Sequence, residues 1–282
     1  HRLKIAIRLM IRQRFFSVLN VIGLALGSAC FLLMFTYITD ELKYDQFHEK
    51  SDRLYRVNMT NIWIEDNDIF GSTSPGVAKA IRNDIPEAES VVRVHMPYSG
   101  TKLIQITDAA GNIRNFEEDW IMAAGNDFFA VFSFPLLTGN PETALANPNS
   151  MVISKRYAQM FFKGEDALGK SISIGIGAAQ QTYMVTGIVE NVPPTSHFTF
   201  DILLSLNSFP NIQEREDSWW WTTFVTYVVL DQQSDPMVIE QKLKLLPTKY
   251  VGEEIAEEKN WSLFLQKVTA IHLNSNDIPN RF

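Results

Sequence analysis

The sequence predicts an α+β protein in which one amino-terminal transmembrane helix is followed by a large domain with a mixed sheet. Three observations predict this fold. The opening 14 residues hold five basic residues and no acidic one. Residues 15–39 carry no charge, whereas all 32 Asp and Glu residues lie at position 40 or later. From residue 40 onward, strand-like and helix-like segments alternate over a stretch long enough for one large or two small domains.

The uncharged segment has the length of a membrane span. At about 1.5 Å of rise per residue, a helix over residues 15–39 reaches roughly 37 Å, and a bilayer core needs about 30 Å. Gly23, Gly27 and Ser28 leave room for another helix, so we expect the span to pack against protein as well as membrane lipid. A cleaved signal peptide is the alternative. The apolar run is longer than the usual ~7–15 residues and no small-residue cleavage site follows, which favours a retained anchor.

Charge sets the predicted orientation and excludes one class of partner. Short basic flanks stay in the cytoplasm, so residues 1–14 are predicted to be cytoplasmic, 15–39 to span the membrane and 40–282 to lie outside. The outer part is acidic, because it holds all the acidic residues and lacks the five basic residues of the amino terminus. Nucleic acid is therefore excluded as a partner. The single cysteine, Cys30, lies in the span, so the outer domain has no disulfide.

The first half of the outer domain predicts strands around one short helix. Residues 53–64 alternate apolar and polar side chains, which is typical of a strand. Pro75 suits the first turn of a helix over 75–84, and Pro86 ends it. Two strands follow at 90–95 and 103–107. A turn at 108–111 then joins the second of them to a strand at 113–122, which makes a hairpin.

The second half of the outer domain predicts a buried phenylalanine-rich segment, two helices and more strands. Residues 126–137 place four phenylalanines within seven positions, a density that predicts burial. Ser154 is the expected N-cap of a helix that ends at Phe162, and a long helix over 235–258 is expected to bend near Pro247. The remaining predicted strands are 171–176, 182–189, 198–206, 222–230 and 261–267. The many hairpins favour a mixed sheet in two layers over a doubly wound parallel sheet.

Residues 164–171 (GEDALGKS) match the Walker A sequence pattern GxxxxGK(S/T). A phosphate-binding loop follows a strand and opens a helix, so that the helix amino terminus faces the phosphates. Here the predicted order is the reverse, with a helix before the loop and a strand after it. Glu165 and Asp166 would also repel a triphosphate. We therefore interpret the segment as a helix-to-strand turn capped by glycine, and Gly175-Ile-Gly177 as a hairpin turn.

No catalytic, metal or cofactor site is predicted. Asp40, Glu41, Asp45 and His48 resemble a metal site on one helical face, but a solvated helix over 40–50 just outside the membrane is the preferred interpretation. His197 and His95 have no Ser or Cys partner at a recognisable spacing.

Three consecutive tryptophans, Trp219, Trp220 and Trp221, are the most conspicuous aromatic feature. Side chains of an extended segment alternate in direction, so at least one tryptophan is expected to be exposed. This run predicts a subunit interface, a contact for a hydrophobic substrate or a contact with the membrane surface. A satellite cluster under a loop is the structural alternative.

Several segments in a fixed order resemble the FtsX-like permease family of ABC transporters, with its MacB-like periplasmic core domain. The segments are 12–27 (RQRFFSVLNVIGLALG), 40–48 (DELKYDQFH), 53–57 (RLYRV), 128–137 (FFAVFSFPLL), 144–150 (ALANPNS), 169–170 (GK), 185–188 (VTGI) and 191–201 (NVPPTSHFTFD). They extend over nearly the whole chain, and their shared order makes the signal more specific than any one of them.

The resemblance implies a protein of the bacterial inner membrane. Its two-lobed periplasmic domain would be inserted between a first and a second membrane span. It implies a non-catalytic permease subunit without a cofactor, paired as a homodimer or with a related permease. A cytoplasmic ABC ATPase would drive it, and a periplasmic adaptor is a further implied partner. The family exports or extracts substrates, and these 282 residues are expected to be an amino-terminal part because no second span is predicted in them.

The leading hypothesis is a mechanical coupler in which Asp40, Glu41, Tyr44 and Asp45 belong to a helical stalk that transmits motion of the span. The alternative is a single-pass sensor whose outer domain binds a ligand. The basic segment 1–14 is too short to be a cytoplasmic signalling domain, which counts against the sensor. A membrane-tethered hydrolase that uses His197 or His95 is a third, weaker hypothesis.

Overall fold

The computed structural model describes residues 11–60, 62–63, 69–97, 100–107 and 111–274. Most of the predicted cytoplasmic segment and most of the turn expected at 108–111 therefore lie outside the described residues. The chain divides into two compact units, His1–Tyr44 and Asp45–Phe282. The boundary between the two units lies within the predicted 40–282 domain.

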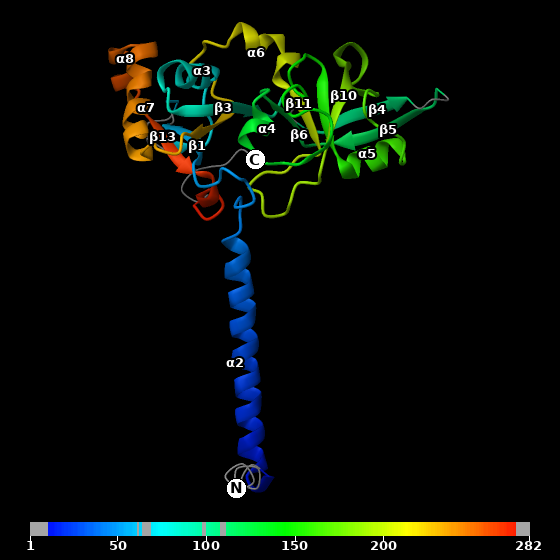
Figure 1. Ribbon diagram of the computed structural model, residues 1–282, viewed down its shortest axis with the longest axis vertical. Helices are drawn as coiled ribbons and strands as arrows, with labels where there is room; N and C mark the ends of the chain where they lie inside the picture. Colours follow the sequence, from blue (N-terminus) through cyan, green and yellow to red (C-terminus); the bar gives the residue numbers. More distant parts are fainter. Residues whose placement is uncertain (1–10, 61, 64–68, 98–99, 108–110, 275–282) are drawn as a thin grey trace. The chain divides into compact units, whose positions relative to one another are not determined.

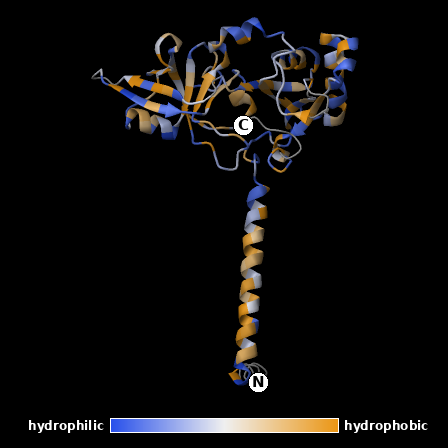
Figure 2. Ribbon diagram, turned by 180° about the vertical axis from the view of Figure 1, so that it is seen from behind, coloured by the Kyte–Doolittle hydropathy of each residue, from blue (hydrophilic) through white to orange (hydrophobic). Residues whose placement is uncertain are grey.

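The first unit is dominated by one helix, α2 (Arg14–Glu41), which has no buried residue. Apolar residues predominate along most of its length (Figure 2). Among the described residues, it is the one helix long and apolar enough to cross a membrane. The predicted helical stalk over 40–50 is wrong. The helix ends at Glu41, residues 42–50 form turns, and Asp45 has a left-handed backbone with φ of 57°.

The second unit is built on one sheet, whose strands run through the upper part of Figure 1. The strands are β1 (Leu54–Thr60), β2 (Ile69–Phe70), β3 (Ala88–His95), β4 (Lys102–Thr107), β5 (Ile113–Glu118), β6 (Ile121–Ala124), β7 (Leu136–Thr138), β8 (Ser150–Ser154), β9 (Ser171–Ile174), β10 (Gln181–Val189), β11 (Ile202–Ser205), β12 (Phe224–Leu230) and β13 (Leu263–Lys267). Their main order is β13-β1-β12-β3-β6-β11-β8-β10-β9-β4-β5, with β2 on β1 and β7 on β10. Among the strands that the structure describes, β6/β11 and β8/β10 pair in parallel and the other pairs are antiparallel, so the predicted mixed sheet is confirmed.

Short helices cover the sheet. They are α3 (Pro75–Asp84), α4 (Phe128–Val131), α5 (Lys155–Phe162), α6 (Pro210–Glu214), α7 (Pro236–Val251) and α8 (Glu253–Glu258), with 3₁₀ turns η1 (Gly177–Ala179), η2 (Leu206–Ser208) and η3 (Val268–Ala270). In Figure 1, α3, α7 and α8 lie at one end of the unit and α5 lies at the other. Each end has its own apolar cluster, and a third cluster between them holds the phenylalanines of α4. The α+β fold class is confirmed, with helices and cores at both ends of a shared sheet.

Two predicted boundaries differ from the structure. The strand expected at 113–122 is two strands, because β5 pairs with β4 whereas β6 pairs with β3 and β11. The single helix predicted at 235–258 is two helices, and Pro247, where a bend was expected, lies inside the first of them, α7. The break between the two helices lies at Gly252, whose φ of 103° and ψ of 149° lie outside the helical region.

Candidate functional site

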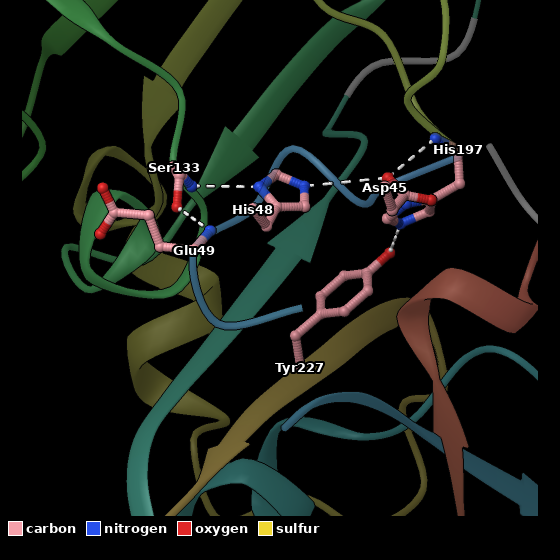
Figure 3. A network of polar contacts seen from close by, with 6 residues as sticks. All are labelled: Asp45, His48, Glu49, Ser133, His197 and Tyr227. Atoms are coloured by element: carbon pink, nitrogen blue, oxygen red, sulfur yellow. Dashed lines mark hydrogen bonds and ion pairs between the residues drawn. The ribbon is translucent and has the colours of Figure 1, made fainter. Parts of the chain in front are cut away.

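A buried polar network begins at Asp45, the first residue of the second unit (Figure 3). The Asp45 N–H donates to the Thr195 carbonyl at 2.8 Å. Its Oδ1 accepts two hydrogen bonds from His197, one from Nδ1 at 2.8 Å and one from the backbone N–H at 3.2 Å. The Asp45 side chain is 0% exposed. These contacts replace helical hydrogen bonds, and they explain why the chain leaves the helical conformation after α2.

His197 connects the network to the sheet. Its Nε2 lies 2.8 Å from the hydroxyl of Tyr227 on β12. Burial lowers the pKa of His197, so the ring is neutral, donates from Nδ1 to Asp45 and accepts the Tyr227 hydroxyl proton at Nε2. Burial also raises the pKa of Tyr227, which keeps that hydroxyl protonated. The three side chains therefore form one chain of hydrogen bonds with consistent donors and acceptors.

His48 forms a second connection, to the phenylalanine-rich segment. Its Nδ1 accepts the Ser133 backbone N–H at 3.1 Å, while the Ser133 hydroxyl accepts the Glu49 N–H at 2.9 Å. The ring packs against Phe132 and Phe134, with centroids 5.2 and 5.3 Å apart. Burial lowers the pKa of His48 to about 4, although the nearby Asp45 acts in the opposite direction. His48 is therefore neutral at neutral pH and holds residues 45–49 against the core.

The network is an anchor and is not arranged as a catalytic triad. Asp45, His48 and Ser133 carry the residue types of a triad, but His48 contacts the backbone N–H of Ser133 and not its hydroxyl. A nucleophile needs its hydroxyl hydrogen-bonded to the base. Asp45 and His48 are also 0% and 1% exposed, so substrate has no access to them. What the arrangement does is fix the chain immediately after α2 to a loop, a strand and the aromatic core.

The structure separates the four predicted stalk residues. Asp45 is the one that lies in the network, whereas Asp40 belongs to the first unit, is 61% exposed and pairs with Lys43 at 2.9 Å. Glu41 and Tyr44 also belong to the first unit. The solvated helix expected for this segment is therefore wrong for Asp45 and His48. Phe47, an apolar residue in an otherwise polar stretch, was the sequence signal that this segment is packed.

The tryptophan run lies at another place in the second unit, just before β12. Trp219 is 5% exposed and packs between Tyr250 and Trp261, with ring centroids at 5.5 and 5.9 Å. Trp220 is 44% exposed and lies 6.0 Å from the exposed ring of Trp63. The expectation that at least one tryptophan is exposed is confirmed by Trp220. Trp221 packs on Phe224 at 5.2 Å.

The Walker-like segment is a helix-to-strand turn, as predicted. It follows α5 and precedes β9. The left-handed C-cap is Lys163 with φ of 52°, and Gly164 follows with φ of 91°, so the cap itself is not glycine. Gly175-Ile-Gly177 lies in the β9–β10 hairpin, as expected. Within the part of the chain that the structure describes, no group of three His, Cys, Asp or Glu residues is placed to hold a metal.

Comparison with known proteins supports this fold. A domain of a provisionally described permease protein from Porphyromonas gingivalis is 22% identical, with a TM-score of 0.64 over 78% of this chain and 92% of that one. The periplasmic region of MacB from Actinobacillus actinomycetemcomitans is 13% identical, with a TM-score of 0.52 over 82% of this chain and 95% of that one. No curated protein sequence matches significantly. The family described as MacB-like periplasmic core domain matches residues 17–245, and the chain therefore belongs to that family.

Proposed function

We propose that this chain acts in a permease subunit of an ABC transporter and couples cytoplasmic ATP hydrolysis mechanically to export or extraction of a substrate outside the membrane. In this proposal α2 crosses the bacterial inner membrane with its amino terminus in the cytoplasm. The sheet-containing unit is then periplasmic. Chemistry occurs in a partner ABC ATPase, and the chain contributes no catalytic residue.

The observation that carries the proposal is the short, anchored connection between α2 and the second unit. Only residues 42–44 separate Glu41, the last residue of α2, from Asp45. Asp45 is fully buried and bonded to Thr195 and His197. A long flexible linker would absorb a displacement of the helix by changing its own conformation, whereas three residues and a buried anchor absorb little. Motion of α2 is therefore delivered to the packed unit.

Two surfaces fit the partners that a coupler requires. On α2, a Cβ added at Gly23 or Gly27 would meet nothing within 4 Å, so another helix of a homodimer or related permease could approach there closely. Exposed Trp220 and Trp63 offer an aromatic surface for a periplasmic adaptor, the partner subunit or a hydrophobic substrate.

A linker insertion tests the coupling. We insert a flexible Gly/Ser segment between Leu42 and Tyr44 in the assembled transporter and measure ATP hydrolysis and transport separately. We expect hydrolysis to continue and transport to be lost, because the displacement of α2 no longer reaches Asp45. The matched control carries the same insertion at η1, a hairpin tip where a Cβ added at Gly177 would meet nothing within 4 Å, and it should transport normally. Normal transport with the linker after Leu42 would refute the mechanical role.

A single-pass sensor is the second candidate, because a pocket of about 330 Å³ adjoins the anchor. Residues of the 192–199 segment line it, including His197, together with Trp120 and Met122. A ligand there would contact the same segment that holds Asp45. The reading frame after Phe282 separates the candidates: further apolar runs support a permease, and a stop codon favours a sensor.

A further inference from the structure

A second cavity, of about 430 Å³, lies at the sheet end formed by β9, β4 and β5, and it has an unusual charge for this acidic protein. Three cationic side chains line it, namely Arg114, Lys163 and Lys170, and they face one carboxylate, Glu165. The lining therefore carries a net charge of about +2, although the chain as a whole carries −7. The hydroxyls of Thr107 and Ser171 add neutral donors.

The fold brings these charges together from separate elements. Arg114 comes from β5, while Lys163 and Lys170 bracket the turn between α5 and β9. Left-handed backbone at Lys163, Gly164 and Gly169 reverses the chain, so both lysines line the same cavity. A phosphate-binding loop would hold its ligand through backbone N–H groups. This cavity instead offers a ligand the charged side chains of Arg114, Lys163 and Lys170.

Two of the cations are held against aromatic walls. The Arg114 guanidinium donates to the Phe161 carbonyl and lies 5.7 Å from the Phe116 ring centroid. The Lys170 ammonium pairs with Glu165 and lies 5.0 Å from the Phe162 ring centroid. Rings on one side reduce hydration of the cations, which strengthens their attraction for an anion. The Lys170–Glu165 pair also means that an entering anion competes with Glu165 for Lys170.

We propose that this cavity binds a phosphate group, with Arg114 and Lys170 as the principal contacts and Lys163 as a third charge. A phosphate dianion neutralises the net positive lining, and the planar guanidinium and the ammonium supply the donors that phosphate oxygens accept. The cavity is large enough for a phosphate together with part of the molecule that carries it. This binding is independent of the coupling role proposed above.

Calorimetric titration of the full chain in uncharged detergent tests the site, with sodium pyrophosphate as the probe. We expect one saturable site for wild type and at least about tenfold weaker binding for Lys170→Gln, which removes one charge-assisted contact. The matched control is Lys244→Gln, because Lys244 also pairs with a carboxylate, Glu240, and lies 5.2 Å from the ring centroid of Phe264. It should bind like wild type. Glu165→Gln removes the competing carboxylate and should bind more tightly.

The source of the phosphate is distinguished by a second pair of probes. Short-chain phosphatidic acid presents a lipid phosphate monoester, and short-chain phosphatidylcholine presents a phosphate diester with a compensating cation. Saturable pyrophosphate binding supports a soluble phosphorylated ligand, whereas binding of phosphatidic acid alone supports a lipid headgroup. The proposal is overturned if neither pyrophosphate nor phosphatidic acid binds. It is also overturned if the Lys170 and Lys244 variants lose affinity equally. Circular dichroism confirms that each variant is folded before its titration.

Discussion

Asp40 and Asp45 lie five residues apart in the chain, yet their environments are opposite. Asp40 lies at the surface of the first unit and pairs with Lys43, whereas Asp45 is fully buried in the second unit and pairs with His197. The same contrast recurs between the adjacent Trp219, which is buried, and Trp220, which is exposed. Residue type therefore does not set the role of these side chains. Their partners set it, and matched substitutions at each pair test this difference.

The largest difference is expected within the tryptophan pair. Trp219→Ala leaves a cavity between Tyr250 and Trp261 and should lower the free energy of unfolding by about 4 kcal/mol. Trp220→Ala removes an exposed ring and should cost about 1 kcal/mol or less. Urea denaturation followed by circular dichroism measures both. Equal losses would show that Trp220 is buried in the folded protein and that the contrast does not hold.

The aspartate pair should differ nearly as much. Asp45→Ala leaves the Nδ1–H and the backbone N–H of His197 without their acceptor, which we expect to cost about 3 kcal/mol. Asp40→Ala removes an exposed pair and should cost at most about 0.5 kcal/mol. The thermal midpoints of the two variants provide the measurement. A small loss for Asp45→Ala would contradict the anchoring role.

The buried histidines make the anchor sensitive to acid. The pKa of His48 falls to about 4 on folding from an ordinary value of 6.5, so below 6.5 protons bind the unfolded chain preferentially. The stability that neutral His48 contributes is complete above pH 6.5 and is lost as the pH falls from 6.5 through about 4. This loss amounts to about 3 kcal/mol, and His197 acts in the same direction.

Denaturation midpoints between pH 4 and pH 7 check this dependence. His48→Asn, whose side-chain carbonyl can accept the Ser133 N–H, should flatten the profile in this range. An unchanged profile for His48→Asn would mean that another group causes the acid sensitivity.

The smallest effect is expected where the network reaches the sheet. Tyr227→Phe keeps the ring in the core and removes the hydroxyl that donates to His197 Nε2. The lost hydrogen bond should cost about 1 kcal/mol. The same denaturation experiment measures it, with Tyr55→Phe on β1 as a tyrosine control outside the network. A loss as large as that of Asp45→Ala would make Tyr227, and not Asp45, the principal anchor.

Local patterns predicted most of the elements. Pro75 and Pro86 bracket α3, and the Ser154 side chain accepts the Tyr157 N–H at the start of α5, because these signals act within one turn of the helix. The break at Gly252 was missed because Pro247 is the stronger local signal. The site was predicted only in part: Asp45 was named as a stalk residue, but its partner His197 is 152 positions away in the chain.

Local sequence patterns are enough to predict the apolar helix with its basic flank, the burial of the phenylalanine-rich segment and the turn at the Walker-like run. Each of these depends on residues close together in the chain, and the many predicted hairpins also indicate the mixed sheet. Contacts between distant segments determine that Asp45 and His48 are buried, that β6 leaves β5 to pair with β3 and β11, and that Arg114 joins Lys163 and Lys170 at one cavity. These outcomes depend on desolvation and on partners distant in sequence, and composition and periodicity carry no information about which distant groups meet.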